Sequence, residues 1–309
     1  MKLSVVICTR NRAPALIQCL ESIDVAARRA GLTDAEIIVT DNGSSDGTPE
    51  IARNWATGAS IAVRLEHEPR PGITITKNRG LRAARGELLV LTDDDCRLQP
   101  DYFVHLLRLH ETDPTAALRG GRVELGDPAD LPLTIKTDTM RRRWHIGDRS
   151  ARRENLGNCL LGCNLFMTRA VYERLGPFDE RFGVGAIPAG EDTDYIFRAY
   201  TAGLSIEYVP DIVVYHHHGR KVPEAANRLW RNYMIGSGAL YAKHLMTCPS
   251  LCLQLRWDLK HFAREVVTRN NLFLPDYGFS YADKMRCYAD GAISFLVSAL
   301  SRAPAGHRR

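Results

Sequence analysis

The chain has 309 residues, of which 45% are hydrophobic, and a formal net charge of +5. These values are those of an ordinary globular protein, and they exclude an intrinsically disordered or fibrous chain. The length allows either one large α/β domain or a domain with an appendage, and we expect the second. We place the boundary after Arg220, with a first domain at residues 1–220 and an extension at 221–309.

The first half alternates short apolar runs with segments of helical spacing, a pattern that predicts a parallel sheet flanked by helices. The first apolar run is too short for a signal peptide, and it predicts the first strand. We expect strands at residues 3–8, 36–40, 62–65 and 88–91, and helices at 14–30, from Pro49 onward, and at 74–85.

Polar clusters follow three of these strands, at Thr9 to Arg12, Asp41 to Asp46 and Asp93 to Asp95. In open sheets of this kind, ligands bind outside the carboxyl ends of the strands. We therefore expect the three clusters to meet at one ligand-binding edge.

The regular alternation fades after Pro100. We expect strands at residues 118–125, 159–167, 205–209 and 212–215, an irregular basic stretch at 128–155, a helix at 192–202, and helices from about Pro223 onward. Lys and Arg outnumber Asp and Glu after Arg220. That excess could face a phosphate-bearing ligand or an anionic membrane surface, or it could simply be solvated.

No stretch offers the roughly 18 or more uninterrupted apolar residues of a membrane span. We therefore expect a cytoplasmic protein, either free or peripheral at the cytoplasmic face of the membrane. The basic segment carries neither a known nucleic-acid-binding module nor interleaved aromatic residues, so we expect no nucleic-acid partner.

Eight cysteines lack the dense, even spacing of a secreted disulfide framework. Cys159 with Cys163, and Cys248 with Cys252, form two C-x3-C pairs that could in principle hold zinc. Each pair lies in a hydrophobic run, where cysteine packs as a small core residue, and we expect that role.

Asp93, Asp94 and Asp95 place three adjacent carboxylates at a strand end, where they repel one another unless a cation or hydrogen bonds compensate. Oxygen-rich sites suit Mg²⁺ or Mn²⁺, which commonly bridge carboxylates to substrate phosphates. The alternative is an acidic turn that caps the following segment.

The order of these features resembles the family 2 glycosyltransferases, which have the GT-A fold of the nucleotide-diphospho-sugar transferases. The resemblance covers about two thirds of the chain, from Leu3 to about Arg220. Six short segments carry the resemblance, in the order found in the family: Ser4 to Arg12, Glu36 to Thr48, Lys77 to Gly80, Thr92 to Asp95, Gly162 to Asn164, and Gly190 to Asp194. It implies a GT-A, Rossmann-like α/β fold with a mixed, mainly parallel sheet and a helical C-terminal extension.

The resemblance implies a nucleotide-sugar donor, by default a UDP-sugar. Thr9, Arg10 and Asp41 would line the base and ribose pocket, with Asp41 accepting a hydrogen bond from the base. Lys77 and Asn78, at a helix start, would approach the nucleotide, as a cation and a positive helix end suit phosphate.

Asp93 and Asp95 would form the D-x-D element of the family, with Asp93 toward the ribose or metal, Asp95 a ligand of Mn²⁺ or Mg²⁺, and Asp94 a spectator. His216 matches a histidine that family members often add, although three consecutive histidines also fit an exposed loop.

Asp192 is the candidate general base, since a carboxylate opposite the leaving diphosphate can take the proton of an acceptor hydroxyl. The resemblance implies a single displacement that inverts the anomeric centre, without a covalent intermediate. Gly162, Asn164 and Glu191 are acceptor-side candidates, and helix capping is the alternative role of Glu191 and Asp194.

Arg10 stands where the family frequently has tyrosine, and the Gln-x-x-Arg-Trp element of processive polysaccharide synthases is not evident. We therefore expect a single-addition enzyme, of a kind used in polysaccharide biosynthesis, whose acceptor is a carbohydrate, a lipid-linked molecule or a small molecule. A degenerate domain that serves as a binding or scaffold subunit is the alternative. A sugar-phosphate nucleotidyltransferase is disfavoured, because no glycine-rich loop follows the first strand.

Overall fold

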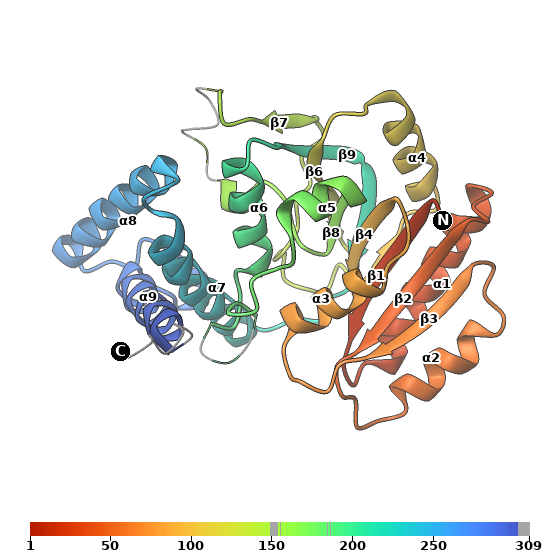
Figure 1. The fold of residues 1–309 in the computed structure, drawn as a ribbon. Coiled ribbons are helices and arrows are strands. Elements are labelled where there is room, and N and C mark those ends of the chain that lie inside the picture. The colour runs from red at the N-terminus through yellow and green to blue at the C-terminus, as the bar shows by residue number, and fades with distance from the viewer. Residues whose placement is uncertain (149–153, 155, 184, 186, 302–309) are drawn as a thin grey trace, which may run out of the picture.

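The structure is a computed structural model, and it describes all residues except 149–153, 155, 184, 186 and 302–309. A curved sheet occupies the centre of the molecule, and three C-terminal helices lie to one side of it (Figure 1). The strands are β1 (Leu3–Thr9), β2 (Ala35–Asp41), β3 (Ala62–His67), β4 (Leu88–Asp93), β5 (Cys96–Leu98), β6 (Ala117–Leu125), β7 (Arg142–Trp144), β8 (Asn164–Thr168) and β9 (Ser205–His216). The helices are α1 (Ala13–Arg29), α2 (Thr48–Ala56), α3 (Ile73–Ala83), α4 (Tyr102–Thr112), α5 (Arg169–Leu175), α6 (Glu191–Thr201), α7 (Pro223–His244), α8 (Pro249–Thr268) and α9 (Tyr281–Ser301), with short 3-10 turns at Leu156–Asn158 and Pro275–Tyr277.

The strand order is β3-β2-β1-β4-β8-β6-β9-β5, with β7 added on β9. β1 to β4 pair in parallel, and Val5 of β1 lies between Ile37 of β2 and Val90 of β4. β8 runs antiparallel to both β4 and β6, whereas β6 and β9 are parallel. The expected mixed, mainly parallel α/β fold with a helical C-terminal region is confirmed.

Side chains alternate between the two faces of the central strands, because successive residues of a strand point in opposite directions. Val5 and Ile7 of β1 join a core with α1 and α4 on one face, while Val6 joins a second core with Leu81 of α3 on the other. Burial on both faces explains why these strands appear in the sequence as continuous apolar runs. Because β1 pairs in parallel with β2 and β4, the carboxyl ends of these three strands lie at the same edge of the sheet.

The part after Pro100 is more regular than its sequence predicts. α4, α5 and β7 were not expected, and the two strands predicted at 205–209 and 212–215 are one strand, β9. Pro210 lies between the two predicted segments, and proline lacks a ladder donor. The β6 pairing instead jumps from Val209 to Val213 at this point, a bulge that accommodates the proline within a single strand.

Two other expectations are corrected in detail. In place of the strand expected at 159–167, the structure has the shorter strand β8 at Asn164–Thr168, which follows a 3-10 turn at Leu156–Asn158. Residues 149–153 and 155 of the stretch expected to be irregular lie outside the described residues. Cys159, Cys163 and Cys248 are buried as expected, whereas Cys252 is exposed.

α7 and α9 cross at close range because glycines stand at their contact. A Cβ atom at Gly238 would lie 2.1 Å from the carbonyl oxygen of Tyr288, and one at Gly291 would lie 1.8 Å from that of Ile235. β9 ends at His216 and α7 begins at Pro223, so the predicted boundary after Arg220 lies in the link between the last strand and the first C-terminal helix. Among the described residues, none of the helices has both the length and the apolar character needed to cross a bilayer.

We predict that Gly291→Ala lowers the free energy of unfolding by about 1–3 kcal/mol, because the new methyl group overpacks the α7–α9 contact. Alanine would otherwise favour the helix by about 1 kcal/mol, so the sign of the change reports the contact. Gly58→Ala, in the turn after α2, is the control for a methyl group added in open space, since its Cβ would meet nothing closer than 4.0 Å. Urea denaturation measures both variants, and a Gly291→Ala variant as stable as the wild type would refute the contact.

Candidate active site

A cavity of about 1510 Å³ opens at the carboxyl edge of the sheet. Strand ends form one side of it, with Thr9, Arg10 and Asp93 among the lining residues. α7 to α9 form the other side, with aromatic residues such as Trp230 and Tyr233. The cavity therefore lies between the sheet and the helical extension, and both parts of the chain shape it.

Arg12 and Thr9 compensate the charges of the acidic loop after β4. The Arg12 guanidinium donates to Asp94 Oδ1 at 2.9 Å and to Asp95 Oδ2 at 2.7 Å. The Thr9 hydroxyl donates to Asp94 Oδ2 at 2.8 Å. Asp94, predicted to be a spectator, thus ties the acidic loop to Thr9 and Arg12 at the end of β1.

Burial and neighbours separate the acidities of these carboxyls. Burial raises the pKa of Asp94 to about 6, although Arg12 and Thr9 favour its charged form. Burial would also raise the pKa of Asp95, but the contacts with His216 and Arg12 outweigh it and hold that pKa well below its usual range. Asp95 is therefore the dependably charged member of the pair at neutral pH.

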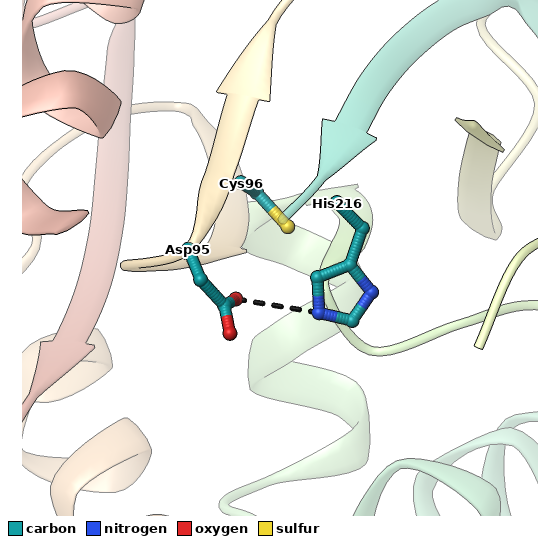
Figure 2. Close-up of side chains that lie close together, drawn as sticks. All are labelled: Asp95, Cys96 and His216. Atoms are coloured by element: carbon teal, nitrogen blue, oxygen red, sulfur yellow. Dashed lines mark ion pairs between the residues drawn. The ribbon is translucent and has the colours of Figure 1, made fainter. Parts of the chain in front are cut away.

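Asp95 and His216 lie side by side at the cavity wall, next to the Cys96 thiol (Figure 2). Oδ1 of Asp95 is buried and pairs with Nε2 of His216 at 3.3 Å, and it accepts no other hydrogen bond. Two ligands of one octahedral ion at 2.0–2.1 Å stand about 3 Å apart, so this pair fits a shared divalent metal. The carboxylate suits both Mg²⁺ and Mn²⁺, and the imidazole favours Mn²⁺, the transition metal of the two.

Cys96 completes the cluster of possible ligand atoms, which lie within 4.8 Å of one another. Burial raises the pKa of its thiol well above the usual range, so the sulfur stays protonated. Mg²⁺ and Mn²⁺ suit oxygen ligands, whereas sulfur suits softer metals, which leaves Asp95 and His216 as the candidate ligands. In the described part of the chain, neither C-x3-C pair belongs to a cluster that could hold zinc.

Asp192 lies in the first turn of α6, where Lys77 of α3 holds it across the cavity wall. The buried Lys77 ammonium donates to Asp192 Oδ1 at 2.7 Å and to Glu191 Oε1 at 3.1 Å. Oδ2 of Asp192 lies directly over Gly162, since a Cβ atom there would come within 1.6 Å of it. Gly162 is therefore a glycine because the carboxylate occupies the space of a side chain.

The surroundings make Asp192 a weaker acid than usual. Burial raises its pKa to about 7, Lys77 opposes the shift, and Glu191 adds to it. The pKa of Lys77 is itself well above its usual value, because the adjacent carboxylates outweigh the effect of burial. With a quarter of its side chain exposed, Asp192 can give and take a proton near neutral pH.

Three predicted site residues are buried in the fold and do not line the cavity. Asp41 accepts from the backbone N–H of Ser44 at 3.2 Å and pairs with His67. The amide donors of Asn78 go to Phe178 and Glu180, and those of Asn164 go to Arg122 and Ile212. The predicted ligand-binding roles of these three stay predictions.

Sequence reasoning missed Arg12, the cation that joins Asp94 and Asp95. A basic side chain in the turn after β1 was visible, but its partners are 82 and 83 positions away. It also missed that Lys77 contacts Glu191 and Asp192, since each of the three was assigned a separate role. The aromatic wall from α7 had no signal beyond apolar residues at helical spacing.

We predict that Lys77→Met lowers the free energy of unfolding by about 3 kcal/mol, because it leaves two carboxylates without their buried cation. Without Lys77 the pKa of Asp192 rises further above its unfolded value, so the folded state gains stability as the pH falls through it. The loss should therefore be larger at about pH 8.5 than at about pH 6. Urea denaturation at both pH values measures it.

Lys221→Met is the control, because it removes a lysine from an exposed ion pair with Asp127. Exposed pairs contribute about 0–1 kcal/mol, so this variant should unfold like the wild type at both pH values. An equal loss in Lys77→Met at the two pH values would refute the charge compensation.

A glycosyltransferase family model and a curated glycosyltransferase both match this chain. The model of the family described as "Glycosyl transferase family 2" matches residues 4–175. Glycosyltransferase AglE of Haloferax volcanii is 27% identical over 216 residues, which cover 69% of this chain and 66% of AglE. The chain matches between 25% and 66% of the length of AglE and seven other curated relatives.

Solved structures share the fold. TarS 1-349 of S. aureus in complex with UDP has a TM-score of 0.56 at 15% identity, covering 96% of this chain and 92% of that one. The mannosyltransferase PcManGT of Pyrobaculum calidifontis, in complex with GDP-Man and Mn²⁺, has a TM-score of 0.53 at 20% identity, covering 98% and 76%.

Proposed function

The chain belongs to glycosyl transferase family 2, and we propose that it is an inverting enzyme that transfers a sugar from a UDP-sugar to an acceptor hydroxyl. The observation that carries the proposal is the position of Asp192. Its carboxylate faces the same cavity as Asp93, Asp95 and His216, and it is held by a buried cation. A general base and a candidate metal site thus share one cavity.

Asp192 is the general base of the proposed reaction. It takes the proton of the acceptor hydroxyl while the acceptor oxygen attacks the anomeric carbon of the donor. The bond from that carbon to the diphosphate breaks, and the nucleoside diphosphate leaves with the electron pair. A single displacement of this kind inverts the anomeric centre. Lys77 orients Asp192 through Oδ1, which leaves Oδ2 over Gly162 for the proton.

Asp95 and His216 are the proposed ligands of Mn²⁺ or Mg²⁺, with Asp93 beside them at the cavity. Such an ion would supply positive charge for the diphosphate as it leaves. Oδ1 of Asp95, which accepts no hydrogen bond apart from its ion pair with His216, supports the metal site from within the fold. The Mn²⁺ complex of PcManGT supports it from a protein of the same fold.

The proposed donor pocket comprises Thr9, Arg10 and Asp93, all of which line the cavity. UDP is the proposed nucleotide, supported by the UDP complex of TarS. Gly162 and Glu191 also line the cavity on the Asp192 side, where the acceptor would bind. The acceptor is a carbohydrate, a lipid-linked molecule or a small molecule that offers one hydroxyl to Asp192.

We predict metal-dependent release of nucleotide from one member of a panel of UDP-, GDP- and dTDP-sugars, assayed with and without Mn²⁺. Asp192→Asn should lower turnover by about 10²- to 10⁴-fold, because it removes the base while donor binding persists. Asp95→Asn should abolish the dependence of donor binding on Mn²⁺. Direct binding of the donor, measured by calorimetry, separates the two effects.

Asp211→Asn is the matched control, since it makes the same change at an exposed aspartate of β9. It should turn over like the wild type. If no donor binds, with or without Mn²⁺, the enzyme proposal fails and a binding or scaffold subunit remains.

We predict that kcat/KM falls tenfold per pH unit below about pH 7, because kcat/KM reports the free enzyme and protonated Asp192 cannot act as a base. Activity should level off at higher pH, where the carboxylate is fully charged. Initial rates at fixed Mn²⁺ between about pH 5.5 and 8.5 give the profile. A flat profile across this range would show that a group other than Asp192 takes the proton.

A further inference from the structure

One side of α8 exposes apolar side chains to solvent. Leu253, Trp257 and Val267 are 52%, 56% and 83% exposed. At 3.6 residues per turn these positions fall within one side of the helix. Trp257 stands out among the four tryptophans of the chain, because Trp144 is buried and the other two are half-buried.

A row of cations lies on the same side of α8. Arg256, Lys260 and Arg264 follow one another at intervals of four residues, and all three are exposed. Residues at this spacing lie one above the other along a helix. The row therefore runs between the exposed apolar side chains.

The acidic residues of α8 are used inside the fold. Asp258 is 1% exposed and accepts hydrogen bonds from Lys284 at 2.8 Å and from the Tyr288 hydroxyl at 2.9 Å. Glu265 is 8% exposed and accepts from the backbone N–H groups of Tyr281 and Ala282. Both carboxylates fasten α9 to α8, so the outward side of α8 carries positive charge alone.

We propose that this outward side of α8 lies on the surface of an anionic lipid bilayer. Tryptophan favours the membrane–water interface, and the aliphatic stems of lysine and arginine bury beside apolar groups while their charges reach the headgroups. An interfacial helix combines these two features. A second protein would have to cover the apolar side chains and also supply acidic partners at each turn, whereas an anionic bilayer offers both in one surface.

The opposite side of α8 contributes to the cavity that contains Asp192. Leu251 and Gln254 line that cavity. Docking of α8 would therefore place the cavity one helix diameter, roughly 10 Å, from the lipid surface. The proposal itself rests on the surface of α8 and not on the proposed reaction, so the two can fail separately.

The test is sedimentation of the full chain with vesicles of phosphatidylcholine, either alone or with about 30% phosphatidylglycerol. We expect binding only to the anionic vesicles, and weaker binding at high salt because salt screens the attraction. Lys260→Glu with Arg264→Glu should weaken binding at least tenfold. Arg53→Glu with Arg108→Glu makes the same change in net charge on the exposed sides of α2 and α4, and it should leave binding within about twofold.

Trp257→Ser tests the apolar contribution, with Val104→Ser on α4 as its control. The wild-type fluorescence should shift to the blue with anionic vesicles as Trp257 enters the interface, and the shift should vanish in Trp257→Ser alone. Absence of binding, equal binding to neutral vesicles, or an equal loss in both double variants would overturn the proposal. Preferential binding to DNA over anionic vesicles would also overturn it.

Discussion

The compensation of buried carboxylates by a few cations is the constraint on which the site depends. Asp94, Asp95, Glu191 and Asp192 converge on one cavity, although like charges in a poorly solvated place repel strongly. Arg12 bridges the first pair and Lys77 bridges the second, while His216 lies against Asp95. The two sides differ in what remains free. Lys77 holds Asp192 through Oδ1, whereas Oδ1 of Asp95 is buried and has only the His216 imidazole beside it.

The same constraint explains how much could be predicted from sequence. The strand–helix alternation and the strand-end position of Asp93 are local features, and they predicted the fold and the acidic edge. The contact of Lys77 with Asp192 joins residues 115 positions apart, and only the tertiary fold brings the two side chains together. The two strands predicted at 205–209 and 212–215 failed in the opposite way, because a bulge in the β6 pairing carries β9 past Pro210 as one strand.

The helical extension is part of the site because specific contacts fasten it to α6. Asp194, two residues after Asp192, is fully buried and pairs with Lys243 at 2.6 Å and with His244 Nε2 at 2.7 Å, both on α7. Gly236 of α7 lies close to the Ala189 carbonyl that precedes α6. The first turn of α6 therefore presents one carboxylate to the cavity and uses another to anchor the wall opposite.

This arrangement links the character of α8 to the demands of packing. A polar contact between α8 and α9 needs buried acceptors, and Asp258 and Glu265 supply them. Because both acidic residues of α8 point into the fold, the exposed basic residues of the helix have no acidic residue of α8 beside them. Leu251 on the inward side meanwhile lines the cavity. The positive outer surface of α8, and its inner side that packs on α9 and lines the cavity, thus follow from one division of residues around a single helix.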